Sequence, residues 1–200
     1  MKNSGNILLC GVGGQGILLA SELIAFALLA SGMDAKKSEV HGMAQRGGSV
    51  EAHLRYGKKV YSPLIEPGTA DVLIALETME AMRYLPYLHQ GSTVIINTQK
   101  IMPPAVATGK TEYPADIISE LKKRGLKVIP IDGFEIARKA GNVKAANVSL
   151  VGALSSILPI PEKTFIKVIN DKIPARFLEA NLEVFRAGRK AAKGNEGLKM

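Results

Sequence analysis

The sequence has a single cysteine, no tryptophan and only 5% aromatic residues in its 200 positions. One thiol cannot form an internal disulfide, complete a cysteine-based zinc site or ligate an iron–sulfur cluster, because each of these takes more than one cysteine. Cys10 ends the first apolar run and is expected to be a small buried side chain, with a reactive thiol as the alternative. We therefore expect no metal site and no cluster on this chain.

Positive charge is in excess, but much of it lies at the C-terminal end. The formal net charge is +8, and half of it falls in residues 186–200. The charged residues of that segment are Arg186, Arg189, Lys190, Lys193 and Lys199, with Glu196 as the single acid. We interpret it as a frayed basic end. No basic run is interleaved with Phe or Tyr, as a stacking surface for bases requires, so no nucleic acid is expected as a partner.

The sequence also lacks a long uninterrupted apolar run. The first thirty residues superficially resemble a secretory signal, but glycines interrupt the apolar stretch at 11–16, and Ser21 and Glu22 interrupt the next apolar stretch. We expect a cytoplasmic protein without a membrane anchor.

Strand and helix patterns alternate through the first two thirds of the chain. Strands are expected over 6–10, 35–40, 50–56, 71–76, 93–97 and 127–131, and helices over 17–30, 78–88 and 117–125. Residues 60–63 are expected to pair back as a short strand, which would give an antiparallel element. The alternation predicts an α/β fold, a Rossmann-like three-layer α/β/α arrangement with a mostly parallel sheet.

The last third is predicted to be helical, over 133–140, 148–158, 161–169 and 175–192. No internal repeat, low-complexity tract or Gly/Ser linker divides the chain. We expect one domain over 1–200, with an α/β core (1–132), a helical portion (133–192) and a basic tail (193–200).

A glycine loop comes directly after the first apolar run. Gly11, Gly13 and Gly16 satisfy G-x-G-x-x-G, and Gly14 and Gln15 complete the loop. In that pattern the first glycine permits a tight turn, the second lets the backbone approach a ligand, and the third lets the helix pack on the strand. We expect backbone N–H groups of the loop to be presented at a helix N-terminus.

A second glycine-bearing loop lies some twenty-five residues further on. It comprises His41, Gly42, Gln45, Arg46, Gly47 and Gly48, together with Met43 and Ala44, and Ser49 comes directly after it. Together the two loops predict one composite site at the carboxyl ends of the strands. Arg46 is the best candidate to bind a carboxylate or phosphate, with a salt bridge to a partner as the alternative. Gln45 and His41 are expected to hydrogen-bond in a pocket or interface, or to stabilise the loop.

The residues alone leave two enzymatic hypotheses weakly supported. A Rossmann nucleotide site needs an acid at the end of the second strand, where only Asp34 and Glu39 qualify, and a P-loop is excluded because no G-K-[ST] comes after the glycines. A self-sufficient hydrolase or transferase needs a nucleophile with its base or a set of metal ligands, and the sequence offers neither arrangement. Few acid–base groups suggest a chain that completes a site whose reactive group comes from elsewhere.

For some polar residues we expect a structural role. His53 and His89 are expected to be solvated or structural, with His89 in a loop. Asn147 and Ser149 are expected to cap a helix rather than face the site.

Four segments carry a family resemblance along essentially the whole chain: residues 11–16 (GVGGQG), 38–49 (SEVHGMAQRGGS), 146–154 (ANVSLVGAL) and 180–188 (ANLEVFRAG). They resemble the gamma-type subunit of the 2-oxoacid:ferredoxin oxidoreductases. The second loop resembles the indolepyruvate branch, in its beta subunit, more than the pyruvate or 2-oxoglutarate branches.

The resemblance implies a division of labour between subunits. A large partner would hold thiamine diphosphate with magnesium and [4Fe-4S] clusters, while this chain packs beside the thiamine site and is inactive alone. The implied reaction is oxidative decarboxylation of an aryl 2-oxo acid with coenzyme A, giving an acyl-CoA, carbon dioxide and reduced ferredoxin. This chain lacks the Gly-Asp-Gly motif of thiamine enzymes.

Alternatives remain open from the sequence: a stand-alone NAD- or FAD-binding protein, or a non-catalytic assembly subunit. The basic C-terminal residues would be free to steer an acidic ferredoxin, and isolated chains would be free to self-associate through the apolar helix.

Overall fold

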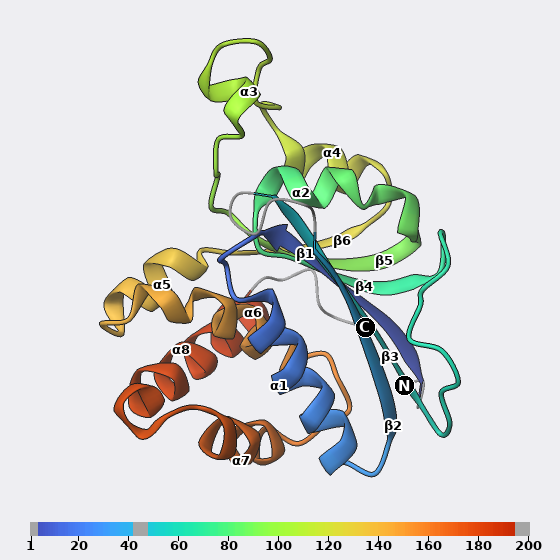
Figure 1. Cartoon of the computed structure of the whole chain (residues 1–200), viewed down its shortest axis with the longest axis vertical. Helices are drawn as coiled ribbons and strands as arrows, with labels where there is room; N and C mark the ends of the chain where they lie inside the picture. Colours follow the sequence, from blue (N-terminus) through green and yellow to red (C-terminus); the bar gives the residue numbers. More distant parts are fainter. Residues whose placement is uncertain (1–3, 42–47, 195–200) are drawn as a thin grey trace.

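The computed structural model describes residues 4–41 and 48–194, with the backbone alone described at His41 and Pro104. A six-stranded sheet in the order β2-β3-β1-β4-β5-β6 forms the middle layer (Figure 1). Its strands are β1 (Gly5–Val12), β2 (Asp34–His41), β3 (Ser49–Gly57), β4 (Ala70–Ala75), β5 (Leu88–Asn97) and β6 (Lys127–Ile131). The helices are α1 (Ile17–Ala30), α2 (Thr78–Arg83), α3 (Pro104–Ala107), α4 (Ile117–Lys123), α5 (Gly133–Lys139), α6 (Ala146–Ser155), α7 (Glu162–Lys172) and α8 (Ala175–Gly194), with 3-10 turns η1 (Leu85–Tyr87) and η2 (Val143–Ala145).

The two faces of the sheet carry separate cores. Ile7 and Leu9 of β1 face α1, α6, α7 and α8, whereas Leu8 and Cys10 face α2 and α4. This follows from the period of two along a strand, and it explains why β1 is apolar at consecutive positions. The predicted three-layer α/β/α fold, the mostly parallel sheet and the helical last third are confirmed (Figure 1).

The antiparallel element has a different origin from the predicted one. Residues 60–63 form no strand; instead β3 itself runs antiparallel to both β1 and β2, between which it lies. Two carbonyls of this connection, Ser62 O and Leu64 O, accept hydrogen bonds from Arg55 Nη1 at 3.2 and 3.3 Å. A side chain satisfies these groups in place of a strand partner, and Pro63 has no N–H to offer one.

The orientation of β3 decides which strand ends meet. β4, β5 and β6 run parallel to β1, and β2 regains the direction of β1 because it is antiparallel to β3. The carboxyl ends of five strands, β1, β2, β4, β5 and β6, therefore lie at one edge of the sheet, where β3 begins. We call this the loop edge.

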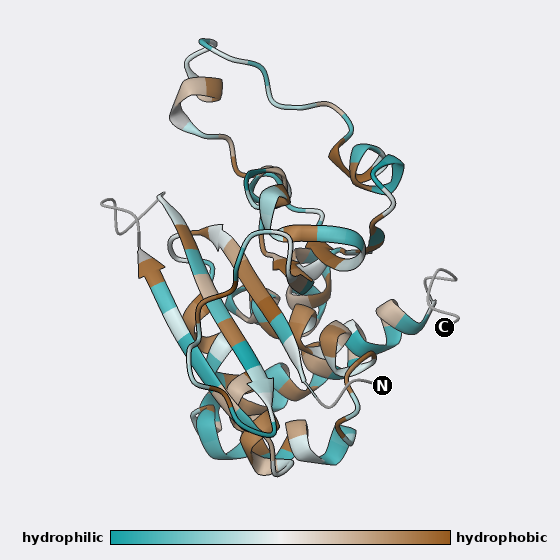
Figure 2. Ribbon diagram, turned by 90° about the vertical axis from the view of Figure 1, so that its right-hand side faces the viewer, coloured by the Kyte–Doolittle hydropathy of each residue, from teal (hydrophilic) through white to brown (hydrophobic). Residues whose placement is uncertain are grey.

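Edge strand β2 is mostly hydrophilic along its length (Figure 2). Its Lys36 and Lys37 place charges on the outermost strand, a common protection against strand-to-strand aggregation. Lys37 Nζ lies 2.5 Å from Glu39 Oε1 and 3.7 Å from Glu22 Oε1 of α1.

Strand β5 begins earlier than predicted. It starts at Leu88, so His89 and Gly91 lie within the strand rather than in a loop. Parallel pairing of Leu88 with Ala70 extends it, with an irregularity in the register before Val72. The predicted helix over 78–88 divides at Pro86, as proline requires: α2 ends at Arg83 and a 3-10 turn carries Pro86.

Helix α6 is buried on every side between the sheet and α8 (Figure 1). Close approach of the two helices depends on Gly152 and Gly188: a Cβ at Gly152 would overlap Phe185 O, and one at Gly188 would overlap Ser149 O. These glycines belong to two of the segments that carry the family resemblance. Their role is to bring helix backbones together.

The basic C-terminal segment is not frayed from residue 186. Helix α8 continues to Gly194, and Arg189 is largely covered, with 17% of its side chain exposed. Arg189 Nη1 donates to Ser155 O and, at 2.9 Å, to Ser155 Oγ, and Nε lies 3.1 Å from Glu162 Oε2. This arginine joins the end of α6 to the start of α7. Residues 195–200 of the predicted tail lie outside the described residues.

Within the described ranges, no helix combines the length and apolar character needed to cross a membrane. Helix α1 does expose three large apolar side chains, those of Leu18 (41%), Phe26 (37%) and Leu29 (45%). Their spacing places them along one side of the helix.

Replacing Gly188 by Ala tests the contact between α6 and α8. The added Cβ meets backbone atoms, which cannot move aside as a flexible side chain can, so we expect the free energy of unfolding to fall by about 1–3 kcal/mol. Gly194→Ala is the matched control, because nothing lies within 4 Å of a Cβ at that position of the same helix. Urea unfolding of both variants should separate them; equal stability would contradict the proposed role of Gly188.

Candidate functional site

The two glycine-bearing loops touch at the loop edge. Gly13 N donates to Gly48 O at 2.8 Å, and Val12 is paired with Ser49 across β1 and β3. His41 is paired with Val50, so β2 ends at the same edge of the sheet as β1, with β3 between the two strands. The structure thus brings the glycine loop together with Gly48 and Ser49.

The remaining predicted residues of the second loop have no described position. Gly42, Gln45, Arg46 and Gly47 lie outside the described residues, and so does the side chain of His41. Their predicted roles stay predictions.

Gly11 and Gly16 of the first loop have roles other than those their pattern predicts. Gly11 lies within β1, where a Cβ would be 2.9 Å from Leu76 Cβ and 2.8 Å from Gln15 Oε1, so its role is close packing and not a turn. Left-handed backbone occurs at Gly14 (φ 102°) and Gly16 (φ 79°). Gly16 is the N-cap of α1, where its missing Cβ leaves room for Asn147 Nδ2.

Gln15 fixes the loop to the sheet. Its Oε1 accepts from Val12 N and its Nε2 donates to Leu76 O, both at 2.8 Å. Both ends of the amide are therefore committed to the backbone at the ends of β1 and β4. Gln15 has a structural role in the described molecule.

Asn97 makes a second bond to the same carbonyl. It is 2% exposed, its Nδ2 donates to Leu76 O at 3.1 Å, and its Oδ1 accepts from Gly133 N at 3.1 Å. The end of β5 is thereby tied to the end of β4 and the start of α5. Asn97 was not among the residues expected at the site. The sequence gives one indication of its role, which is its position as a polar residue at the end of an apolar strand.

The predicted capping role of Asn147 and Ser149 is wrong. The N-cap of α6 is Ala145, which belongs to the turn η2, and Ser149 Oγ donates to Ala146 O at 2.6 Å. Asn147 Nδ2 donates to Gly16 O at 2.8 Å instead. Asn147 thus joins the helical portion to the glycine loop, although 131 positions separate the two residues.

A cavity of about 480 Å³ opens beside the glycine loop. Its wall includes residues 14–16, Leu76, Asn97, Lys144 and Asn147. A volume of this size is in the range of small-molecule sites, and the carboxyl edge of a parallel sheet is where such sites form.

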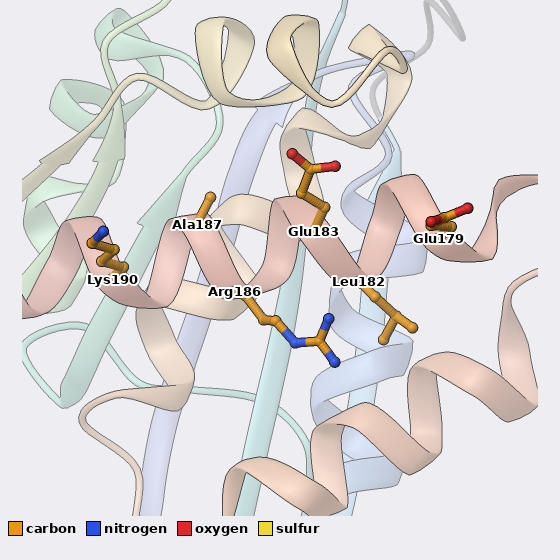
Figure 3. Close-up of a pocket in the computed structure, with 6 residues that line it drawn as sticks. All are labelled: Glu179, Leu182, Glu183, Arg186, Ala187 and Lys190. Carbon is orange, nitrogen blue, oxygen red and sulfur yellow. The ribbon is translucent and has the colours of Figure 1, made fainter.

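A second hollow, of about 440 Å³, has a different character (Figure 3). All of its lining residues belong to α8, with Arg186 and Leu182 directed to one side of the helix and Glu183 to the other. A groove along one helix presents side chains without convergent backbone groups, so we do not assign it to the site.

Ser49 begins a buried polar network on the other side of the loop edge. Its Oγ donates to Glu80 Oε2 and lies 3.2 Å from the hydroxyl of Tyr84. Glu80 is 5% exposed, and its Oε1 lies 3.2 Å from Arg83 Nε. Burial raises the pKa of the Tyr84 hydroxyl, which stays protonated at neutral pH. The network holds the end of the second loop against α2.

Glu77 performs a similar task at the start of α2. It is the N-cap, accepts from Glu80 N at 2.9 Å and from Ile101 N at 3.1 Å, and accepts from the hydroxyl of Tyr113 at 2.5 Å. Both carboxylate oxygens of Glu77 accept hydrogen bonds. These bonds offset the cost of burying the group, which is only 1% exposed.

Cys10 is a buried structural residue, as predicted. It is 0% exposed, and burial, with a smaller effect of the nearby carboxylates of Glu80, Glu77 and Glu51, raises the pKa of its thiol. A thiol with a raised pKa is a poor nucleophile and a poor metal ligand at neutral pH. In the part of the chain that the structure describes, no group of three or more His, Cys, Asp or Glu residues is arranged to hold a metal ion.

His53 is structural, as expected. Its Nδ1 accepts from Ile65 N at 3.0 Å, and Nε2 lies 3.5 Å from Glu51 Oε1. His89 Nε2 lies 4.0 Å from Asp71 Oδ1.

The arrangement counts against an ordinary dinucleotide site. Glu39 Oε1 accepts from Ser21 Oγ at 3.1 Å and from Lys37. Its strand β2 is separated from β1 by β3, whereas the ribose-binding acid of the Rossmann fold ends the strand next to the first.

The link through Gln15 can be tested by Gln15→Glu. The change replaces the donor to Leu76 O by a second acceptor, so we expect the free energy of unfolding to fall by about 1–3 kcal/mol. Gln90→Glu, at an exposed position of β5, is the control and should have little effect. Chemical denaturation of both variants measures this, and an unchanged midpoint for Gln15→Glu would show that the bond contributes nothing.

Comparison with known proteins agrees with the resemblance in the sequence. Residues 6–191 match the family model of pyruvate ferredoxin/flavodoxin oxidoreductase. Indolepyruvate oxidoreductase subunit IorB of Archaeoglobus fulgidus is 45% identical over 92% of this chain and 92% of its own length. The subunit of the same name in Thermococcus kodakarensis is 40% identical over 96% of this chain and 98% of its own.

A solved structure has the same fold. It is the 2-oxoglutarate:ferredoxin oxidoreductase of Magnetococcus marinus with 2-oxoglutarate, coenzyme A and succinyl-CoA bound, with a TM-score of 0.76 and 24% identity over 96% of this chain and 32% of that one. The family model covers nearly the whole chain, and the relatives match it along nearly their full length. The chain belongs to the pyruvate ferredoxin/flavodoxin oxidoreductase family.

Proposed function

We propose that this chain is a subunit of an indolepyruvate:ferredoxin oxidoreductase and acts within a multi-subunit complex. The observation that carries the proposal is 40–45% identity, over more than nine tenths of both chains, to two subunits of that enzyme. The complex oxidatively decarboxylates an aryl 2-oxo acid with coenzyme A and passes the electrons to ferredoxin. We place it in the cytoplasm as part of the same proposal.

The residues of this chain do not fit an iron–sulfur cluster. An iron–sulfur cluster needs several accessible thiolates, and the only cysteine is wholly buried. We therefore assign the [4Fe-4S] clusters to a large partner subunit. We assign thiamine diphosphate with its magnesium ion to the same subunit, because this chain lacks a Gly-Asp-Gly motif. Bound there, thiamine diphosphate supplies the carbanion chemistry of decarboxylation.

The role we assign to this chain is to complete the site beside the partner's cofactor. Hydrogen bonds of Gln15, Asn97 and Ser49 fix the loop edge, and Ser49 comes directly after the second loop. Arg46 would supply a guanidinium to the substrate carboxylate or to a phosphate, because its two parallel donors match either group. His41 and Gln45 would add hydrogen bonds.

A contact with another chain is supported by helix α1. Leu18, Phe26 and Leu29 remain exposed along one side of it, although most of the helix is buried. Apolar side chains arranged in this way are typical of surfaces that a partner covers.

Co-expression with a large subunit of the same enzyme tests the proposal directly. The purified complex should reduce viologen in a coenzyme-A-dependent manner, faster with indolepyruvate or phenylpyruvate than with pyruvate or 2-oxoglutarate, and the isolated chain should be inactive. A complex that prefers pyruvate or 2-oxoglutarate would overturn the assignment of an aryl substrate. Failure to form any complex would overturn the proposal that this chain is a subunit of the enzyme.

Replacing Arg46 by Ala tests the second loop within that complex. Loss of one charge-assisted contact to the reacting anion costs about 2–3 kcal/mol, so we expect kcat/KM to fall by roughly 30- to 150-fold with assembly intact. Arg124→Ala is the control, because Arg124 pairs with Glu120 on the surface of α4. Unchanged turnover in Arg46→Ala would favour the alternative function, an assembly subunit whose loops only pack.

A further inference from the structure

One face of helix α8 carries a pattern of charges that the fold itself does not use. Six residues line the hollow on this face: Glu179, Leu182, Glu183, Arg186, Ala187 and Lys190 (Figure 3). The four charged members are exposed, and the two uncharged members are partly buried. Gly188, which packs against α6, lies on the opposite side of the helix, because successive residues of an α-helix are about 100° apart. The face is therefore directed away from α6.

The charges of this face are separated by sign along the helix. The two acids, Glu179 and Glu183, precede the two bases, Arg186 and Lys190. Within each pair the like charges are four residues apart, a spacing that destabilises an isolated helix. Glu183 and Arg186 point to opposite sides of α8 (Figure 3), and in the described part of the chain none of the four charges forms an ion pair. They are therefore available to another molecule.

The charged positions are symmetric about the middle of the face, which lies between residues 184 and 185. Counted outward from this midpoint, Glu183 corresponds to Arg186, and Glu179 corresponds to Lys190. Each correspondence thus joins an acid to a base. A second copy of α8, packed antiparallel about a two-fold axis through the midpoint, would place every acid opposite a base, and each contact would occur twice.

The order of the charges also specifies the register. A slip of one heptad in one direction would place Glu179 opposite Glu183 of the second copy, and a slip in the other direction would place Arg186 opposite Lys190 of the second copy. A parallel pairing would place like charges opposite each other along the whole face. Like charges in contact disfavour all of these arrangements. Among them, only the centred antiparallel pairing brings each charge opposite one of the other sign.

The contact is limited to the middle of α8. The next charges outward on this face, Arg176 and Lys193, are both basic, and the guanidinium of Arg176 lies 4.6 Å from the centre of the Phe177 ring. Two helices that cross at an angle have diverged at that distance from the crossing point. The pairing therefore covers residues 179–190, about 16 Å of helix. Exposed ion pairs contribute little individually, so we expect a weak dimer that salt weakens further.

We propose that this face of α8 is a docking surface for a second copy of the same chain, with the two helices antiparallel about a two-fold axis. The partner is identified by charge complementarity, because the face is complementary to itself. Its residues belong neither to the loop edge nor to the exposed side of α1. The inference therefore does not depend on the proposed function, and either can fail without the other.

Analytical ultracentrifugation of the full chain, at micromolar to millimolar concentration and at low and high salt, measures the dimerisation Kd. We expect Arg186→Glu to raise Kd at least about tenfold, because the symmetry places two acids opposite each other at both contacts. The double variant Glu183→Arg, Arg186→Glu exchanges the two charges and should restore the Kd. Lys163→Glu, at an exposed position of α7, is the matched control for net charge.

Three results would overturn the proposal. The first is a chain that stays monomeric at every concentration. The second is a dimer whose Kd is the same in Arg186→Glu as in the control, which would form through another surface, such as the exposed side of α1. The third is a folded double variant in which the Kd is not restored.

Disulfide cross-linking measures the register independently. A mixture of the Glu179→Cys and Lys190→Cys chains should form a covalent dimer on oxidation, because the two positions face each other in the proposed pairing. Either variant alone should not, because its two thiols would be about 16 Å apart along the helices, too far for a disulfide. Cys10 is buried and does not contribute. Cross-linking that is equal in the mixture and in the separate variants would contradict the antiparallel arrangement.

Discussion

The carbonyl of Leu76 is the point on which the loop edge depends. It accepts from Gln15 Nε2 and from Asn97 Nδ2, which arrive from the ends of two different strands. The far ends of both amides are also used, by Val12 N and by Gly133 N. One backbone oxygen thus ties β1, β4, β5 and α5 together. Because both amides are buried or partly buried, each bond also avoids the cost of an unpaired polar group.

Strand β3, which lies between β2 and β1, begins at this edge. It runs antiparallel between β2 and β1, so the second loop leaves β2 and enters β3 at the edge where the glycine loop ends β1. The bond from Gly13 to Gly48 and the network from Ser49 to Glu80 then attach the entry to β3 on both sides. A βαβ crossover in place of β3 would send the chain away from this edge. The topology therefore explains why Gly48 and Ser49 lie beside the glycine loop, although they are distant from it in sequence.

The layers could be predicted well from the sequence because they follow from periodicity. Consecutive apolar residues such as Leu8 and Leu9 indicated a strand, and both residues are 0% exposed in the structure. Prediction was poor where one side chain replaces a backbone partner. Arg55 satisfies the connection after β3, where a strand was expected, and Arg189 is held by Ser155 and Glu162 in a segment expected to fray. Such contacts join residues far apart in sequence and leave no local pattern.

The candidate site was predictable only in part for the same reason. The G-x-G-x-x-G spacing located the loop, but the role of each glycine depends on its neighbour: Gly11 on Leu76 and Gln15, and Gly16 on Asn147. Asn147 was expected at a cap because a polar residue at a helix start usually has that role. Its partner lies at the start of α1, and nothing in the order of residues indicates that α1 and α6 meet there.

Most polar groups near the loop edge form hydrogen bonds within the fold, and a few do not. Gln15, Asn97, Glu77 and Glu80 use their hydrogen bonds on the frame, and Cys10 is buried with a raised thiol pKa. Among the described residues, the start of α1, the amide oxygen of Asn147 and Lys144 stay uncommitted, all beside one cavity. None of these groups carries an electron. We therefore propose that the redox chemistry belongs to another chain, against which the hydrogen-bonded loop edge is positioned.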